Sequence, residues 1–223
     1  MMKEPPRRRS NALALVGFLV AAWLGAVFVA AQIDESVMRW LDGPGPFSAP
    51  SIRAWIEPVF RETLDAAVFL TVLGVLFAFS NRRRLVASWL IGILLSAGFT
   101  RIMKIAIGRS RPRADAGADS FEPFSFGSVS HSFPSGHTSS AFAMAALLGL
   151  YFPRGRVIFW ILALVVGLER VRTGAHFLSD VIGGAGVGLL AVYVSYRALG
   201  SKFFELNRVD APSLAQGDAV SRG

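Results

Sequence analysis

Six long apolar runs, separated by short polar stretches, restrict this chain of 223 residues to the architectures that a lipid bilayer allows. Hydrophobic residues make up 53% of the sequence and charged residues only 17%, and the mean hydropathy of +0.49 is too high for an ordinary soluble domain. Inside a bilayer every backbone N–H and C=O must be satisfied within the chain, so apolar runs of about 20 residues cross it as helices. The sequence predicts an all-α, polytopic membrane protein with six transmembrane helices in a bundle.

The first predicted span covers residues 11–31. A cleaved signal peptide is the alternative, because Val29, Ala30 and Ala31 resemble a small-residue cleavage site. The apolar run is longer than the hydrophobic region of such a signal, which favours a retained helix. The other five spans are predicted at 64–79, 85–100 (extending to about 107), 138–152, 157–168 (extending to about 173) and 181–199.

One membrane domain, residues 11–199, is expected between a cytoplasmic basic tail at 1–10 and a partly disordered cytoplasmic tail at 200–223. Within it, residues 32–63 are too polar to cross the bilayer. Their apolar side chains recur at helical spacing opposite charged ones, which predicts a helix lying in the membrane interface on the outer face. A plain connector is the alternative. The apolar positions are Ile52, Trp55, Ile56, Val59 and Phe60, and the charged ones are Arg53, Glu57 and Arg61.

Positive charge is concentrated on one side of the predicted membrane domain. If the spans alternate, the side of the N-terminus carries thirteen of the 23 Lys and Arg but only four of the 15 Asp and Glu. Positive residues favour the cytoplasm, so both termini are expected inside, in a bacterial inner membrane. The basic residues form small clusters and no continuous stripe, which argues against nucleic acid as a partner. The absence of cysteine excludes disulfides and thiol nucleophiles.

The first of three polar motifs, K-x6-R-P, consists of Lys104, Arg111 and Pro112 at the end of the third span. If the helix continues, steps of three or four residues align Arg101, Lys104, Gly108 and Arg111, and Pro112 is expected to end it. Arg101 by itself fits a side chain that reaches out to the bilayer edge. Lys104 and Arg111 suit a phosphate, because arginine offers a two-pronged donor and lysine a point charge.

The second motif, Pro134-Ser135-Gly136-His137, comes just before the fourth span. A loop that turns into a helix N-terminus presents free backbone N–H groups and the positive end of the helix dipole, which together bind anions. Gly136 lets the backbone approach an anion closely, and Ser135 can donate its hydroxyl. His137 beside them is a candidate proton donor.

The third motif, R-x5-H-x3-D, consists of Arg170, His176 and Asp180 between the last two spans. One helical turn separates His176 from Asp180, so the carboxylate can meet the imidazole. A carboxylate on one ring nitrogen fixes the tautomer and leaves the other nitrogen free to attack phosphorus. Alternatively, Asp180 caps the last helix, which its position also allows.

All three motifs fall on the predicted external face, and together they match an anion and not a metal. His137, His176 and Asp180 could formally hold a metal ion, but the surrounding cations would repel it, so no metal or other cofactor is expected.

His131, in the same loop as His137, fits no motif and is assigned to the loop or to a possible substrate contact. The glycines of the last span, including Gly184-x3-Gly188, have the spacing of close helix packing.

These three motifs, in this order, resemble those of the type 2 phosphatidic acid phosphatase (PAP2) family, in its membrane lipid phosphatase branch, which is related to the vanadium haloperoxidases. The resemblance covers roughly residues 64–199. It implies that His176 is a nucleophile that forms a phosphohistidine, that Asp180 is its partner and that His137 protonates the leaving oxygen. The residues that it implies for holding the phosphate are Lys104, Arg111, Ser135, Gly136 and Arg170.

One position departs from the family pattern, which usually has serine where this chain has Glu169. Glu169 is expected to pair with Arg172 or Lys104. The resemblance implies a metal-independent phosphatase acting on a lipid phosphate or diphosphate at the outer face of the bilayer, such as undecaprenyl diphosphate, phosphatidylglycerophosphate, phosphatidic acid or lipid A phosphate. A lipid phosphotransferase and a non-catalytic lipid-binding or transport relative are the alternatives. The six predicted spans argue against a haloperoxidase, since those relatives resemble soluble proteins.

Overall fold

The structure is a computed structural model that describes residues 6–43, 83–127 and 130–200. The predicted second span at 64–79, the interfacial helix around residues 52–61 and the tail at 201–223 lie outside these residues. Within them the regular secondary structure is helical, apart from one isolated bridge between Arg109 and Phe121. The prediction of an all-α protein is therefore confirmed for the part that is described.

Five long helices form the described bundle. They are α1 (Pro6–Asp42), α4 (Arg83–Ile107), α5 (Gly136–Tyr151), α6 (Arg156–Arg172) and α7 (Leu178–Leu199), with the short turns η2 (Pro112–Ala114) and η3 (Pro153–Gly155). Among the residues that the structure describes, three helical stretches are long and apolar enough to cross a membrane: Ala14–Asp42, Ala87–Ile107 and Leu178–Leu199. At 16 and 17 residues, α5 and α6 are shorter, and the full set of six spans stays a prediction.

One predicted boundary, the end of the first span, is wrong. The first helix does not end at residue 31 but continues to Asp42, because Val37, Met38 and Leu41 pack against an apolar cluster that includes Val171 and Val181. Residues 32–42 therefore belong to the bundle and not to a segment lying on the bilayer.

The helix α4, the third span of the prediction, ends before Pro112, because Gly108 breaks it. Gly108 has φ of 62°, a backbone conformation that glycine adopts at little cost. A Cβ at this position would lie 1.7 Å from the carbonyl oxygen of Glu122. The helix thus stops at Ile107, as the sequence indicated for the span, but the stripe of cations does not continue to Arg111.

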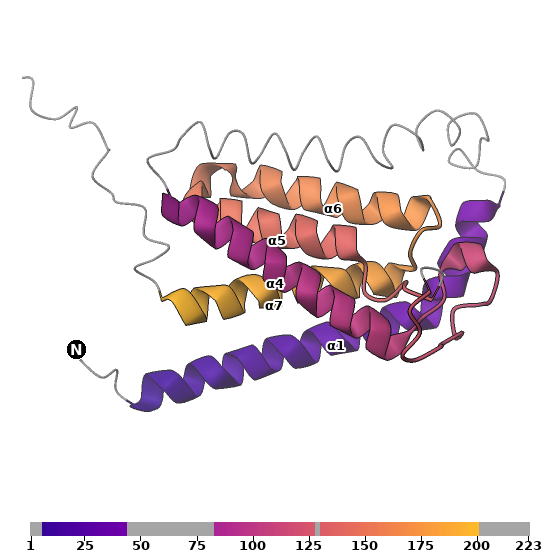
Figure 1. The fold of residues 1–223 in the computed structure, drawn as a ribbon, viewed down its shortest axis with the longest axis horizontal. Coiled ribbons are helices and arrows are strands. Elements are labelled where there is room, and N and C mark those ends of the chain that lie inside the picture. The colour runs from indigo at the N-terminus through magenta and orange to yellow at the C-terminus, as the bar shows by residue number, and fades with distance from the viewer. Residues whose placement is uncertain (1–5, 44–82, 128–129, 201–223) are drawn as a thin grey trace, which may run out of the picture.

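The helices run side by side, with α5 in contact with α4, α6 and α7, and with α1 lying along α7 (Figure 1). The end of α4, the start of α5, the end of α6 and the start of α7 gather at one end of the bundle (Figure 1). The three polar motifs therefore meet at one end, as expected from the alternation of spans. The opposite end holds η3 and the end of α7.

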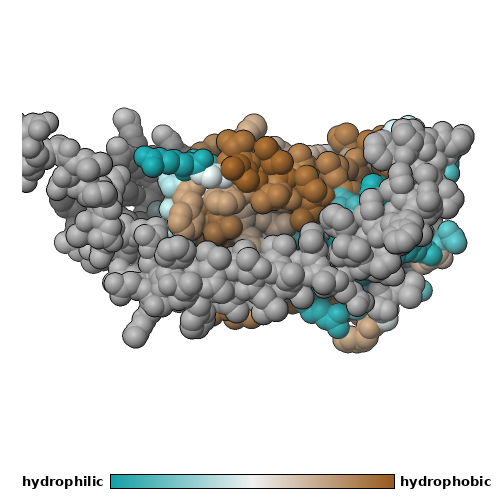
Figure 2. All heavy atoms as spheres, turned by 90° about the horizontal axis from the view of Figure 1, so that it is seen from above, coloured by the Kyte–Doolittle hydropathy of each residue, from teal (hydrophilic) through white to brown (hydrophobic). Residues whose placement is uncertain are grey.

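Polarity is reversed relative to a soluble bundle. The outward faces carry large exposed apolar side chains, such as Phe18 and Phe28 on α1 and Ile158 and Leu162 on α6, and Figure 2 shows an apolar belt over one face with hydrophilic residues toward its ends. Serines, arginine and aspartates are buried inside. This arrangement is expected where the surrounding solvent is lipid.

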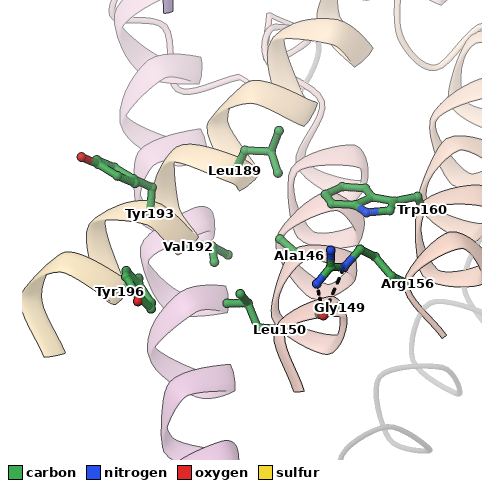
Figure 3. Close-up of a pocket in the computed structure, with 9 residues that line it drawn as sticks. All are labelled: Ala146, Gly149, Leu150, Arg156, Trp160, Leu189, Val192, Tyr193 and Tyr196. Atoms are coloured by element: carbon green, nitrogen blue, oxygen red, sulfur yellow. Dashed lines mark hydrogen bonds between the residues drawn. The ribbon is translucent and has the colours of Figure 1, made fainter. Parts of the chain in front are cut away.

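An apolar hollow of about 540 Å³ opens between α5, α6 and α7 at the end away from the motifs (Figure 3). Trp160, Tyr193 and Tyr196 are among the residues that line it. Arg156 lines the same hollow, and its guanidinium donates to the carbonyl oxygen of Gly149. The hollow is separate from the candidate site described below.

Glycines of α7 allow a close contact with α5. A Cβ at Gly184 would lie 2.4 Å from the carbonyl oxygen of Ser135, and one at Gly188 would lie 2.2 Å from that of Ser139. These distances leave no room for a side chain, so the backbones of the two helices are in direct contact. The predicted role of Gly184 and Gly188 in close packing is confirmed.

Replacing Gly188 by alanine should therefore destabilise the bundle. The added methyl group meets backbone, which cannot move aside as a side chain can, so we expect Gly188→Ala to cost about 1 to 3 kcal/mol. Gly98→Ala on α4 is the matched control, since nothing lies within 4 Å of its Cβ position and alanine favours helix by up to about 1 kcal/mol. Thermal unfolding in detergent should show a lower Tm for the first variant and an equal or higher Tm for the second. Equal Tm values for the two variants would contradict the packing argument.

Candidate active site

Residues from all three motifs meet where four helix ends converge. The backbone N–H of Ser135 donates to the carbonyl oxygen of Asp180 at 2.9 Å, which joins the second motif to the third. A Cβ at Gly136 would lie 3.9 Å from Cε of Lys104, so the first motif adjoins the second. The convergence expected from the sequence is thus present in the structure.

His176 lies in a tight turn between α6 and α7. Gly174, with φ of 64°, allows the chain to reverse, and the backbone N–H groups of Ala175 and His176 both donate to the carbonyl oxygen of Arg170 at 3.1 Å. The turn folds the histidine back under the end of α6, where only 2% of its surface is exposed. Arg170 itself is buried in the last turn of that helix.

Asp180 both caps α7 and faces His176. The sequence left these two roles as alternatives, and the structure has both. Its Oδ2 accepts the backbone N–H of Phe177 at 2.8 Å, as expected of an acid in the first turn of a helix. The same Oδ2 lies 3.6 Å from Nδ1 of His176, a distance longer than a hydrogen bond.

Ser132 completes the link between the carboxylate and the imidazole. Its hydroxyl donates to Oδ2 of Asp180 at 2.5 Å and lies 3.4 Å from Nδ1 of His176. Because the single hydroxyl proton points to the carboxylate, Nδ1 must be the donor to the serine oxygen. The lone pair of the neutral ring then lies on Nε2, the nitrogen that remains available for attack.

The buried imidazole is neutral over the physiological range. Burial lowers the pKa of His176 from its ordinary value of 6.5 to about 4, and the positive charges of Lys104 and Arg111 act in the same direction. The hydrogen bonding and negative charge of Asp180 oppose this shift only in part. A nucleophilic nitrogen needs the neutral form of the ring, which this environment maintains.

The candidate phosphate ligands differ in exposure. Lys104 is half-buried near the end of α4, where its ammonium donates to the carbonyl oxygens of His131 and Ser132 at 2.5 and 3.3 Å. Arg111 is half-buried, has an extended backbone conformation and directly precedes η2. Ser135 is fully buried, and its hydroxyl accepts from that of Thr138 at 2.9 Å.

His137 differs from His176 because it is exposed, in the first turn of α5. That turn leaves backbone N–H groups without helical partners, as in anion-binding helix N-termini. The exposed side chain of His137 belongs to this turn. In the described ranges, no group of three or more His, Asp or Glu side chains is arranged to hold a metal ion.

His131 holds the loop that precedes the second motif. Its Nε2 must donate to the carbonyl oxygen of Ser125, 2.8 Å away, so Nδ1 accepts from the guanidinium of Arg101 at 3.3 Å. Only 4% of the residue is exposed, and both ring nitrogens have protein partners. The structure therefore favours the loop assignment of His131 over the substrate contact.

Glu169 turns toward its own helix. Its Oε2 lies 2.9 Å from Nε of Arg172, which is the first of the two partners expected from the sequence. The acid that replaces the family's usual serine thus has an adjacent counter-charge.

Four residues of the site were missed by sequence reasoning: Asp34, Arg109, Ser132 and Ser179. Arg109 donates through Nη1 to Asp180 at 2.8 Å and to Ser179 at 2.6 Å, and through Nη2 to Asp34 at 2.8 Å. Its guanidinium also lies over the ring of Phe177, 4.4 Å from the centroid. Arg109 could have been found from the sequence, because it is a third cation between Lys104 and Arg111. No motif or spacing in the sequence pointed to Asp34.

The sequence pattern of the PAP2 superfamily matches residues 85–203. A lipid A 1-phosphatase from Rhizobium johnstonii is 42% identical over 193 residues, which cover 78% of this chain and 79% of that protein. Phosphatidylglycerophosphatase B from Bacillus subtilis is 30% identical over 198 residues, which cover 78% of this chain and 91% of that protein. The crystal structure of Aquifex aeolicus LpxE covers 74% of this chain and 95% of its own, with a TM-score of 0.58 and 23% identity, which supports the fold alone.

Titration of the ring nitrogens tests the environment of His176. The chain has three histidines, so ¹⁵N-histidine labelling and the variants His131→Gln and His137→Gln assign every ring signal. Because burial disfavours the charged form, the His176 ring should stay neutral, with its proton on Nδ1, down to about pH 5, and its pKa should fall near 4. A His176 pKa at or above 6.5 would contradict the buried, neutral imidazole.

Proposed function

Because the chain belongs to the PAP2 superfamily, we propose that it removes phosphate from a membrane lipid through a covalent intermediate on His176. Its relatives are lipid phosphatases, and the chain is a hydrolase of lipid phosphate bonds. The observation that carries the proposed mechanism is the buried, neutral imidazole of His176, whose Nδ1 faces Ser132 and Asp180. This geometry prepares Nε2 as a nucleophile.

In the first step, Nε2 of His176 attacks phosphorus and the bond from phosphorus to the lipid oxygen breaks. The ring keeps its proton on Nδ1 and becomes positively charged, and Asp180 stabilises this charge. His137 donates a proton to the departing lipid oxygen, a role that suits its exposed position at the N-terminus of α5. The products of this step are the dephosphorylated lipid and a phosphohistidine.

In the second step, water attacks the phosphohistidine. His137, which lost its proton in the first step, now accepts one from the water, and the bond from phosphorus to Nε2 breaks. Inorganic phosphate leaves and His176 returns to its neutral state. Both histidines end as they began, so the cycle needs no further reactant.

Cations and backbone N–H groups take the part that a metal ion has in many phosphoryl transfers. Negative charge develops on the phosphoryl oxygens, and fixed positive groups around them lower the barrier. We assign this role to Lys104, Arg111 and Arg170 together with the first turn of α5, at Ser135 and Gly136. On the charge distribution of the chain, this end of the bundle faces outward from a bacterial inner membrane.

The 1-phosphate of lipid A is the first substrate to test, because a 42% identical relative over most of this chain is a lipid A 1-phosphatase. Phosphatidylglycerophosphate follows, on the strength of the Bacillus relative, together with phosphatidic acid and undecaprenyl diphosphate. A panel of these four lipids in mixed micelles should show the highest kcat/KM for lipid A. Release of free phosphate in step with substrate loss is expected, and its absence would indicate transfer to another acceptor.

Removal of the nucleophile tests the mechanism directly. His176→Ala should lower kcat by about a thousandfold or more, as loss of a nucleophile does in other covalent enzymes, and Asp180→Asn should lower it strongly because the imidazole loses its counter-charge. Arg154→Gln, an exposed residue of η3 at the opposite end, is the control and should keep the wild-type rate. Near-normal phosphate release from His176→Ala would refute the phosphohistidine.

Inhibitors separate this mechanism from metal-dependent hydrolysis. Vanadate should inhibit because it mimics the five-coordinate phosphorus of the transition state. Activity should survive EDTA, since charge neutralisation comes from side chains and backbone. A strict requirement for added Mg²⁺ would contradict the assignment of Lys104, Arg111 and Arg170 as the charge-neutralising groups.

A further inference from the structure

Asp34 is an acid of α1 that is fully buried beside the candidate active site. It lies outside the part of the chain that matches the family pattern, residues 85–203, and outside all three motifs. A buried carboxylate is costly unless it is paired and hydrogen-bonded. Its burial therefore calls for an explanation in terms of its partners.

The partners of Asp34 connect it to Asp180. Oδ2 of Asp34 accepts from Nη2 of Arg109 at 2.8 Å, and the other end of the same guanidinium donates to Oδ1 of Asp180 at 2.8 Å. The backbone N–H of Ser179 donates to Oδ1 of Asp34 at 3.0 Å, and the Ser179 hydroxyl donates to Oδ2. One buried arginine thus lies between two buried carboxylates.

The charges of these three side chains do not cancel. Arg109 with Asp180 alone would be a neutral pair, and a neutral pair offers little attraction to a positive imidazole. Asp34 adds a second negative charge, so the group as a whole is negative next to His176. Lys104 and Arg111 act on the same imidazole with positive charge, which increases the need for a compensating anion.

We propose that Asp34 is a positioning residue of the active site that balances the charge of Arg109 and so leaves the negative charge of Asp180 to the phosphorylated His176. The proposal rests on the proposed function, because it concerns the positive ring formed in the first step. Asp34 does not touch the reacting atoms. It acts through Arg109, while its bonds to Ser179 hold α1 against the start of α7.

A purely structural role for Asp34 is the rival, and an isosteric variant distinguishes the two. Asp34→Asn removes the charge but keeps the shape and an oxygen that can accept from Arg109. We expect kcat to fall about tenfold or more, which is the effect of removing a group that orients a metal-binding side chain in other enzymes. KM should stay within about twofold of wild type. Glu35→Gln is the matched control, since it removes the same charge from the next residue of α1, which is exposed, and it should keep the wild-type kcat.

A double variant tests whether charge balance is the reason. Asp34→Asn combined with Arg109→Gln removes one charge of each sign, so the net negative charge of the group is restored. If Asp34 balances Arg109, the double variant should have a kcat at least threefold above that of Asp34→Asn. If Asp34 only anchors α1, the second substitution removes a further contact and kcat should fall again.

The outcomes decide between the two readings. A folded Asp34→Asn protein with kcat within twofold of wild type, or a double variant slower than Asp34→Asn, overturns the proposal. If Asp34→Asn does not fold, the double variant decides alone, and a kcat more than tenfold below wild type overturns it. Phosphate release by wild type and its loss in His176→Ala, measured in the same assay, test the proposed function separately.

Discussion

The direct backbone contact between α5 and α7 is the constraint on which the site depends. Without side chains at Gly184 and Gly188, α7 approaches the carbonyl oxygens of Ser135 and Ser139, and the backbone of Ser135 bonds to that of Asp180. The N-terminus of α5 and the acid at the start of α7 are thereby held in one place. Any loosening of this contact would separate the candidate anion site from the candidate nucleophile.

A lipid solvent explains why so many ionisable groups of the site are buried together. Outside the bundle, apolar side chains face the bilayer, so charged groups must find one another inside or reach its ends. Arg109, Asp34 and Asp180 satisfy their hydrogen bonds mutually, and His176 avoids the cost of a buried charge by remaining neutral. The same desolvation that lowers its pKa strengthens every electrostatic interaction around it.

Sequence reasoning predicted the convergence of the motifs because helix alternation and local spacing are short-range properties. His176 and Asp180 are four residues apart, and Glu169 found its partner at Arg172. It missed Asp34 because that partnership with Arg109 spans 75 residues and depends on how α1 packs. It placed the end of the span near residue 107 but could not give the reason, because the contact that requires glycine at 108 comes from Glu122, which spacing does not reveal.

Gly108 allows Arg109 and Arg111, which are two residues apart, to lie in different surroundings. Because α4 ends at Ile107, Arg109 turns inward to the two carboxylates, whereas Arg111 lies half-buried in extended backbone. In a continuous helix, Arg109 and Arg111 would lie about 200° apart on the helix surface. Both would then stay on α4, and neither could adopt the backbone conformation seen here. A single backbone reversal therefore places one arginine of this short basic segment in the interior, bonded to two carboxylates, and the other half-buried in extended backbone. The placements of the two arginines are coupled, because a side chain at position 108 would collide with the backbone of Glu122 and disturb both.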